Sequence, residues 1–499
     1  MTTTNAAERR LFAKSSLLTQ LITTPFIDGE YTPSNDTRYR LAIRDPYSRD
    51  LLIELEEANS DDVEGAVAAA KRSFESGVWS QSHPRNRALV LLRLADLIDS
   101  MNEEIALLEA LDTGKRFAGT RAWDIPNAAE VFRYYAGLCD KIAGERFPAV
   151  GSYRFFSQKE PIGIVAAIMP WNFPFACLAW KLAPALAAGC SVIVKSAERA
   201  PLTTHLFPQL AIKAGLPAGV ISVLPGRGET TGAEIVANSE VRKITFTGST
   251  KTGIEIVQRS APHLPRLSLE LGGKSPNVIL ADANLDRALT SSIGAIFDVA
   301  GQNCLAGSRT FVHAKIYDEF TEKLAILVRK RVLGDNLDDK TEQGPQIDEE
   351  HVLRIEGFVT RARDDGADIL TGGATSSVGS TFFEPTLVAC PRDDMEIARD
   401  EVFGPVGSLF RFDDLDEAID RANQTEFGLA AAIWTADAAK ADKFASNVKA
   451  GTIWINCYGM IDTVAPWGGF RLSGCGKELG WNAIDDFLET KVVFQDISV

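Results

Sequence analysis

The chain has 499 residues, of which 45% are hydrophobic and 24% charged, and its formal net charge is -15. This length allows a large core and predicts two or three domains rather than one. An acidic chain without a basic block is a poor candidate for nucleic-acid binding, and no apolar run is long enough to cross a bilayer, so we expect neither partner.

The first residues, MTTTNAAERRLFAKSSLLTQLITT, are rich in Ser and Thr and poor in acids. A transit peptide is one interpretation of this segment, and a leading helix or frayed tail is the one we favour. The segment does not have the three-part pattern of a secretory signal. The cytoplasm is therefore the expected location.

Seven cysteines are scattered along the chain without a C-x-x-C pair, and there are only five histidines. An odd number of unpaired cysteines argues against a disulfide framework and against a zinc site. We expect no metal. A free cysteine is more often buried filler than a nucleophile, so Cys304 in GQNCLAGSR needs support from its surroundings.

The N-terminal part predicts strands around 26–31 and 51–58, followed by helices at 61–76 and 85–115, where apolar residues recur at helical spacing. From residue 162 strands and helices alternate, which predicts right-handed crossovers and a parallel sheet. The expected strands are 162–170, 191–196, 220–226 and 243–249, and the expected helices are 176–189, closed by Gly189, 201–215, with Pro201 at its start, and 230–239.

A second alternating region extends from about 270 to 457, with a helix at 316–332, and predicts a second α/β domain. The tail at 485–499 alternates loosely between apolar and polar residues. It could add a strand to a partner subunit.

Three polar residues follow the first two strands of the predicted parallel sheet. Ligands bind at the carboxyl ends of such strands. Asn172 falls there, where its amide could donate to an oxyanion, although an Asn before Pro174 could simply form a turn. Lys195 and Glu198 follow the second strand, where a carboxylate could bind ribose hydroxyls and repel a 2′-phosphate, and a solvated ion pair is the alternative.

Two glycine-rich loops follow the third and fourth strands. PGRGETTG, with Gly226, Gly228 and Gly232, misses the G-x-G-x-x-G spacing by one residue. FTGSTKTG lacks the Lys of a Walker motif, but Ser249 and the amides after Gly248 could hold a pyrophosphate at a helix start. Each loop alone is weak evidence for a nucleotide.

The next motif, ELGGKSPN, places Glu270 in an apolar segment, and Cys304 follows 34 residues later. A carboxylate in such surroundings has a raised pKa and is suited to act as a base near neutral pH. A histidine in a Cys–His arrangement is missing, which disfavours a papain-like site. In EVFGPV, Glu401 could hold a ribose and Phe403 could pack on a flat ring.

Taken together in order, these motifs resemble the aldehyde dehydrogenase superfamily, the NAD(P)-dependent and non-phosphorylating kind. The resemblance covers essentially the whole chain and rests on PWNFP, WKLAPALAAG, KSAE, FTGST, ELGGKSPN, GQNC, EVFGPV and PWGGFRLSG. It implies an enzyme of α/β fold with a Rossmann-like NAD domain at 1–138 and 161–271. It also implies a catalytic domain at 272–476 and a small β oligomerisation element at 139–160 and 477–499.

The resemblance implies the catalytic roles residue by residue. Cys304 would be the nucleophile, and Asn172 would hold the oxyanion together with the Cys304 amide. Glu270 would be the base for the thiol or for the water that hydrolyses a thioester. Lys181 would have a supporting or proton-relay role, and Glu478 matches a glutamate assigned to proton relay.

The resemblance also implies that NAD is the cofactor, with NADP less favoured because of Glu198. The implied NAD contacts are Trp171, Lys195, Glu198, Gly228, Gly248, Ser249, Glu401 and Phe403. Dimers or tetramers of identical chains are implied as well. A relative of the fold without catalysis and a CoA-acylating enzyme are alternatives, but the presence of Glu270 favours hydrolysis.

The substrate would be a small aldehyde, and the implied tunnel residues are Phe173, Trp180, Asn303, Leu305 and Trp467. DTGK, WDIPNAA and DTVAPWGG most resemble the branch that acts on ω-aminoaldehydes and γ-glutamylaminobutyraldehyde in polyamine breakdown. Asp462 at the tunnel mouth, or Asp124, could attract an amino group, although either could be an ordinary loop acid. PWGG in place of PFGG would narrow the tunnel, and betaine aldehyde or broad aliphatic aldehydes remain alternatives.

Overall fold

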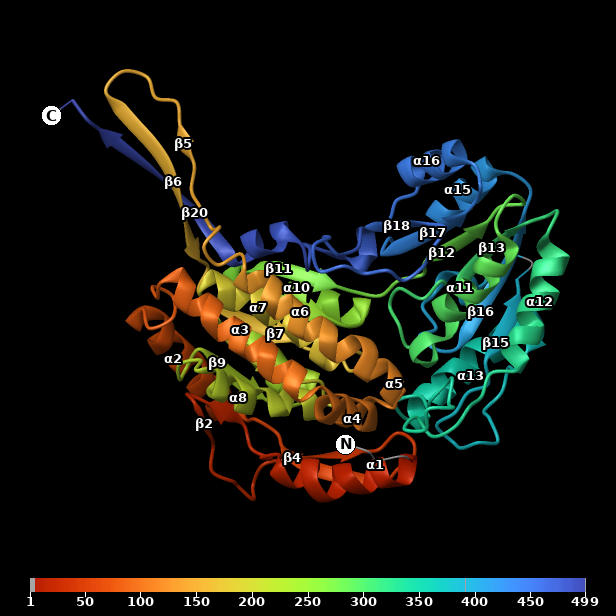
Figure 1. The fold of residues 1–499 in the computed structure, drawn as a ribbon, viewed down its shortest axis with the longest axis horizontal. Coiled ribbons are helices and arrows are strands. Elements are labelled where there is room, and N and C mark those ends of the chain that lie inside the picture. Colours follow the sequence, from red (N-terminus) through yellow and green to blue (C-terminus); the bar gives the residue numbers. More distant parts are fainter. Residues whose placement is uncertain (1–4, 391, 499) are drawn as a thin grey trace.

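The computed structural model describes residues 5–390 and 392–498. Strands in this part of the chain form four sheets, two large and two small. Figure 1 shows two lobes side by side, with a β-arm that projects from the first lobe and carries the C-terminal end of the described chain. Among the described residues, no helix is both long enough and apolar enough to span a bilayer.

The first lobe is built on an eight-stranded sheet in the order β19-β11-β10-β7-β8-β9-β1-β2. Its central strands pair in parallel, which confirms the parallel sheet predicted from the alternation of strands and helices. The edge strands are antiparallel. The strands are β1 (Phe26–Ile27), β2 (Glu30–Tyr31), β7 (Ile164–Ile168), β8 (Ser191–Lys195), β9 (Ile221–Leu224), β10 (Val241–Thr247), β11 (Arg266–Glu270) and β19 (Gly474–Cys475).

Helices surround this sheet, and α7 (Pro174–Ala188) is buried at every residue because its sequence is apolar all round. α7 ends at Gly189 in the left-handed region, as predicted. The other helices of the lobe are α1 (Ala6–Phe12), α2 (Ser60–Ser76), α3 (Pro84–Ser100), α4 (Asn102–Thr113), α5 (Phe117–Gly119), α6 (Ile125–Ala136), α8 (Leu202–Ala214), α9 (Ala233–Ala237) and α10 (Thr250–Ser260), with π and 3-10 turns at Ala13–Leu17, Leu18–Gln20, Thr120–Asp124, Gly228–Gly232 and Ala261–His263.

Two helices differ from the prediction. The segment expected to form one helix at 85–115 is divided into α3 and α4, because Met101 has φ -113° and ψ 21°, which no α-helix continues. The helix expected at 230–239 is reduced to α9, because the glycine-rich stretch before it forms a π turn instead.

The second lobe has a seven-stranded sheet in the order β14-β15-β16-β13-β12-β17-β18, which confirms a second α/β region. Its strands are β12 (Pro276–Ile279), β13 (Arg309–His313), β14 (Asp368–Thr371), β15 (Thr386–Ala389), β16 (Val406–Phe412), β17 (Ala430–Trp434) and β18 (Thr452–Ile455). Its helices are α11 (Leu285–Phe297), α12 (Tyr317–Arg329), α13 (Glu349–Asp364), α14 (Glu396–Arg399), α15 (Leu415–Asn423) and α16 (Ala438–Asn447), with 3-10 turns at Asp298–Gly301 and Arg471–Ser473.

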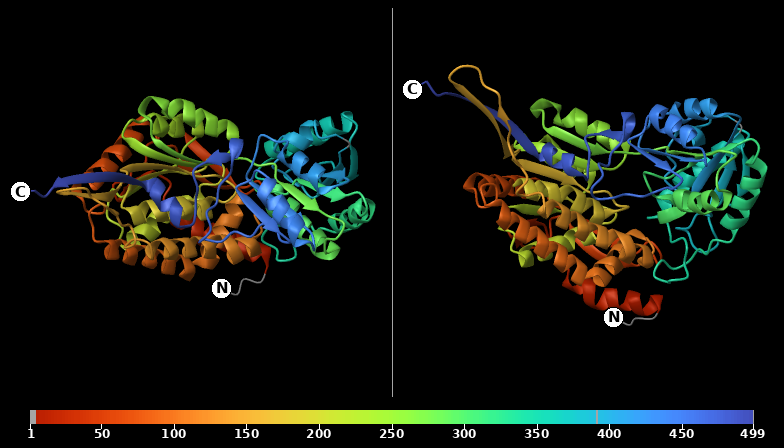
Figure 2. Two further views of the ribbon diagram at one scale, coloured as in Figure 1. Left: turned by 90° about the horizontal axis from the view of Figure 1, so that it is seen from above. Right: turned by 45° about the horizontal axis from the view of Figure 1, so that its top comes forward.

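The arm is a three-stranded sheet in the order β20-β6-β5, formed by β5 (Arg146–Phe147), β6 (Tyr153–Pro161) and β20 (Leu488–Asp496). The tail thus pairs antiparallel with β6 of its own chain, over nine residue pairs. Figure 2 shows the arm extending away from both lobes. β3 (Arg40–Arg44) and β4 (Leu51–Glu56) form a separate hairpin, and a 3-10 segment at Trp481–Phe487 leads into β20.

One short strand lies in a different sheet from its neighbours in sequence. Residues 474–475, which the sequence placed with the second domain, form β19 and pair with β11 of the first sheet. The chain therefore returns to the first lobe before it enters the arm.

Candidate active site

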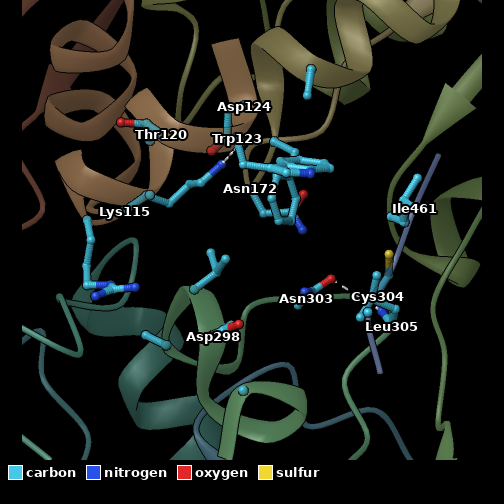
Figure 3. Close-up of a pocket in the computed structure, with 18 of the residues that line it drawn as sticks. Lys115, Thr120, Trp123, Asp124, Asn172, Asp298, Asn303, Cys304, Leu305 and Ile461 are labelled. Carbon is cyan, nitrogen blue, oxygen red and sulfur yellow. Dashed lines mark hydrogen bonds and ion pairs between the residues drawn. The ribbon is translucent and has the colours of Figure 1, made fainter. Parts of the chain in front are cut away.

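A cavity of about 480 Å³ lies between the two lobes. Its walls come from the α4–α6 region and α7 of the first lobe, from the segment after α11, and from the loop after β18. Figure 3 shows side chains from these distant segments pointing into one space, with the Cys304 sulfur on one wall. Asn172, Glu270 and Glu478 line the same cavity, so the structure brings four predicted residues together.

Cys304 reaches this cavity through an unusual backbone. Two residues separate Cys304 from a run of three, Val299, Ala300 and Gly301, that all have positive φ, at 55°, 54° and 74°. Such a left-handed run is rare for side-chain-bearing residues, and it turns the chain sharply after α11. Position 301 excludes any residue larger than glycine, because a Cβ there would lie 2.0 Å from the Gly404 carbonyl oxygen.

The surroundings of Cys304 keep its thiol protonated. Burial raises its pKa to about 12, and the nearby carboxylates of Glu401 and Glu270 act in the same direction. A neutral thiol is a poor nucleophile, so this site needs a base to generate the thiolate.

Asn172 lies just beyond the carboxyl end of β7, as predicted, and is buried. Its Nδ2 donates to the carbonyl oxygen of Gln302 at 3.0 Å, two residues before Cys304. This bond holds the amide beside the cysteine loop. The second hydrogen of the amide is available for an oxygen atom in the cavity.

Glu270 is the last residue of β11 and is buried. Among the described residues, neither of its carboxylate oxygens has a hydrogen-bond partner. Burial raises its pKa well above the ordinary value, Glu478 adds to the rise, and Lys181 and Lys477 oppose it. A buried carboxyl group of this kind is suited to accept a proton near neutral pH.

Lys181 and Glu478 form an ion pair beside this base. Lys181, on α7, pairs with Glu478 and donates to Thr247 Oγ1 at 2.7 Å. Thr245 Oγ1 donates to the same carboxylate at 3.2 Å. The two threonines were not singled out from the sequence, although their alternate positions on a buried strand mark them as facing one side.

The residues assigned to a nucleotide lie at the strand ends, as expected. Lys195 ends β8, and its Nζ donates to Glu198 Oε2 at 2.7 Å. Burial opposes ionisation of Glu198, but the Lys195 charge outweighs it and holds the pKa of Glu198 below its usual range. The Glu198 side chain remains 45% exposed, so its carboxylate is open to a ligand.

The two glycine loops are shaped differently. Ser249 caps α10 by accepting from Thr252 N at 3.1 Å, which leaves the helix N-terminus at the loop. A Cβ at Gly248 would lie 2.4 Å from the Phe246 ring, whereas a Cβ at Gly228 would meet open space. Gly248 is therefore required by packing, and Gly228 leaves room beside the loop.

Glu401, Phe403 and Trp171 form a separate group near the cysteine. Glu401 accepts from Gly273 N at 3.0 Å, and burial raises its pKa to about 7. Phe403 has φ 58°, and its ring lies edge-on to Trp171 at 5.3 Å between centroids. None of the eight expected nucleotide contacts is among the described residues that line the Cys304 cavity.

All five predicted tunnel residues, Phe173, Trp180, Asn303, Leu305 and Trp467, line the cavity. Residues that the sequence did not indicate complete the wall: Lys115, Trp123, Tyr458 and Ile461. These residues belong to loops and turns, and a local sequence pattern does not show which cavity such segments line.

The two candidate acids differ. Asp124 lines the cavity, where it is buried and pairs with Lys115 (Figure 3). Asp462 is exposed and is not one of the residues that line the cavity. Its carboxylate accepts a hydrogen bond from Val464 N at 3.1 Å. Asp462 directly follows Ile461, which lines the cavity, and its position at a tunnel mouth stays a prediction.

Two α/β lobes with a cysteine, a buried carboxyl group and a carboxamide between them define an oxidoreductase of the type that acts on aldehydes. The model of the aldehyde dehydrogenase family matches residues 31–493. The chain belongs to this family, and the match spans both lobes and most of the arm.

Individual relatives agree. An aldehyde dehydrogenase of Enchytraeus buchholzi is 42% identical over 471 residues, which is 94% of this chain and 95% of the relative. The mitochondrial benzaldehyde dehydrogenase of Antirrhinum majus is 41% identical over 450 residues, or 90% and 84% of the two chains. The solved structure of betaine aldehyde dehydrogenase from Staphylococcus aureus in complex with NAD+ has a TM-score of 0.96 and 37% identity, covering 98% of each chain.

Proposed function

We propose that this chain oxidises an aldehyde to a carboxylic acid with NAD, through a covalent intermediate on Cys304. The observation that carries the proposal is the shared cavity, which brings together a thiol, a buried base without a hydrogen-bond partner among the described residues, and a free amide hydrogen. These are the three groups that nucleophilic attack on a carbonyl requires.

The residues of the first lobe fit a dinucleotide. The exposed carboxylate of Glu198 suits a ribose diol, and the capped N-terminus of α10 after Gly248 and Ser249 suits a pyrophosphate. Lys195, Trp171, Gly228, Glu401 and Phe403 would complete the site. When bound, NAD would accept the hydride.

The chain's own residues would then act in a fixed order. Glu270 takes the Cys304 proton, and the thiolate attacks the aldehyde carbon. Asn172 Nδ2 and the Cys304 amide hold the oxyanion of the thiohemiacetal, which becomes a thioester as the hydride leaves. After it has lost the Cys304 proton, Glu270 takes one from water, and the hydroxide adds to the thioester. The C–S bond then breaks, which releases the acid and a Cys304 thiolate that takes a proton back. Lys181 and Glu478 support proton movement.

For the substrate we propose an aminoaldehyde or a broad range of aliphatic aldehydes. The supporting observation is the number of charged groups at one end of the cavity. Lys115 Nζ is paired with Asp124 and lies 3.7 Å from Glu109 Oε1, so two buried carboxyl groups share one lysine there. A substrate ammonium group would reduce the excess of negative charge.

Betaine aldehyde is the second candidate, and aromatic rings favour it. Trp180 and Trp467 lie 6.5 Å apart in the cavity wall, and Trp123 lies edge-on to Phe173 at 5.8 Å. Such faces attract a quaternary ammonium group. One of the solved relatives named above carries this substrate in its name.

The remaining assignments also belong to the proposal. Residues 1–138 and 161–271 would bind NAD, and 272–476 would carry the nucleophile. The arm, from 139–160 and 477–499, would join identical chains into a dimer or tetramer. We keep the cytoplasm as the expected location, with no metal involved.

A substrate panel tests the proposal. Purified protein is mixed with NAD or NADP and with 4-aminobutanal, a γ-glutamyl aldehyde, betaine aldehyde or propanal, and the reduced cofactor is followed by absorbance. We expect turnover with NAD, a lower kcat/KM with NADP because Glu198 repels its 2′-phosphate, and the highest kcat/KM with an amino- or ammonium-bearing aldehyde. No turnover with any of these aldehydes would overturn the proposal.

A further inference from the structure

A buried polar stripe runs along one face of the first sheet. Strands buried on both faces are normally apolar throughout, and the opposite face of these two strands follows that rule with Ile244, Phe246 and Leu269. The stripe consists of alternate residues of two neighbouring strands: Lys243, Thr245 and Thr247 on β10, and Ser268 and Glu270 on β11.

The inner half of the stripe begins at the cavity. Glu270, Thr247 and Glu478 all line it, so water in the cavity can join them. Lys181 bridges Thr247 and Glu478, and Thr245 Oγ1 donates to Glu478. Hydrogen-bonding groups thus lead from the base to the middle of β10.

The outer half ends at the surface. Lys243, whose side chain is fully buried, donates to Ser268 Oγ at 2.7 Å. Ser268 Oγ donates to Asp486 Oδ2 at 2.9 Å, and Lys243 Nζ lies 3.9 Å from the same carboxylate. The Asp486 side chain is 32% exposed, so the series reaches solvent beside the 3-10 segment before β20.

The two halves meet in the register of the sheet. Thr245 and Ser268 are direct partners across β10 and β11, so they share a face at the strand spacing of about 4.8 Å. Lys243 and Thr245 are two residues apart on the same face, roughly 6.7 Å along the strand.

The charges that face Lys243 come from four elements. Burial lowers its pKa to about 8, Arg266 and Lys181 act in the same direction, and Asp486 and Glu478 oppose them. The thiols of Cys190 and Cys475 also lie within its electrostatic reach. A lysine with these neighbours exchanges a proton near neutral pH, unlike an exposed one.

We propose that Lys243, Ser268 and Asp486 form the outer half of a proton path from Glu270 to solvent. The proposal rests on the proposed function. Conversion of an aldehyde, NAD and water to a carboxylate and reduced NAD releases two protons. Glu270, deep in the cavity, takes one proton from the Cys304 thiol and later one from water, while the product acid loses its own proton and the expelled Cys304 thiolate takes one back. The first must leave Glu270 before it can take the second from water. Lys243 thus acts through Glu270 and does not touch the substrate.

The test follows the acyl group on Cys304 in a single turnover. Enzyme with NAD and limiting aldehyde is quenched over time, and the acylated fraction is measured by intact mass. Asp486→Asn still accepts the Ser268 hydrogen bond but holds no proton, and Lys243→Met removes the exchangeable proton. We expect normal acylation in both variants, hydrolysis slowed about tenfold or more, and partial recovery in concentrated small buffers that deliver and remove protons.

Asp485→Asn is the matched control, since this neighbouring acid is exposed and pairs with Lys159. It should hydrolyse the acyl group at the wild-type rate. Wild-type hydrolysis in Asp486→Asn, or an equal loss of acylation and hydrolysis in Lys243→Met with restoration by Lys243→Arg, would overturn the path while leaving the proposed function intact. A wild-type enzyme that forms no reduced cofactor would instead overturn the proposed function.

Discussion

At the scale of single residues, the burial of Cys304 decides the chemistry. Burial raises the pKa of the Cys304 thiol to about 12, and burial also raises the pKa of Glu270 well above its ordinary value. Both groups therefore hold their protons to a higher pH than they would in water. No histidine is among the cavity residues that the structure describes, and both oxygens of Glu270 lack a hydrogen-bond partner among them. We therefore propose that Glu270 takes the thiol proton.

Glu270→Gln tests this proposal. The variant keeps the size of the side chain but cannot accept a proton, so kcat/KM should fall at least about 100-fold. In the wild type the base acts when ionised, and its pKa is raised, so the rate should increase as pH rises through a value well above 4.5. The pH–rate profile of the variant should lack this rise, and a wild-type profile in Glu270→Gln would rule out Glu270 as the base.

Sequence motifs identified several residues that line the cavity, and the structure shows why they could not identify all of them. Cys304, Asn172 and Glu270 stand in motifs at strand ends or loops, where local pattern has meaning. Tyr458, whose hydroxyl donates to the Leu305 carbonyl at 2.7 Å, meets its partner 153 residues away. Such contacts depend on the packing of distant segments.

At the scale of elements, the arm is the part least explained by the lobes. β20 and β6 pair over nine residues, and Phe155 and Phe494 rings lie 4.5 Å apart, yet the Phe494 side chain remains largely exposed. β20 is the outer strand of its sheet, with one edge unpaired among the described residues. An unpaired edge with exposed apolar residues suits a partner strand.

Ending the chain at Phe487 tests the arm. The deletion removes β20 and leaves β6 without its neighbour, so we expect the oligomer to dissociate, as measured by sedimentation velocity. A chain that ends at Asp496 keeps all nine pairs and serves as the control. An unchanged oligomer after the longer deletion, or a monomeric wild type, would show that the arm does not join the chains.

Helices and strands were predictable where the local spacing of apolar residues and the capping residues are sufficient to define them. The alternation from residue 162 identified β7 to β10 and α7 and α8, because buried parallel strands and capped helices have strong local signals. The break at Met101 and the π turn at Gly228–Gly232 were not predictable, since each depends on what the turn packs against. The pairing of β19 with β11 joins residues about 200 positions apart and has no local signal.

At the scale of the whole molecule, the cavity exists only because two sheets meet. The loop after β7 and the end of β11 in the first lobe bring Asn172 and Glu270 to it. The segment after α11 of the second lobe brings Cys304, which faces Asn172 across the cavity in Figure 3. The family match over residues 31–493 spans the same parts. The proposed catalytic site therefore depends on how the two lobes are packed against each other.

The most direct test of this account is the intact mass of the protein after reaction with NAD and an aldehyde, quenched in acid and followed by peptide mapping. In the first turnover we expect one acyl group per chain, located on Cys304, with reduced NAD formed in equal amount. Cys304→Ala should form neither. Reduced NAD produced by Cys304→Ala at the wild-type rate, or an acyl group on another residue, would contradict it.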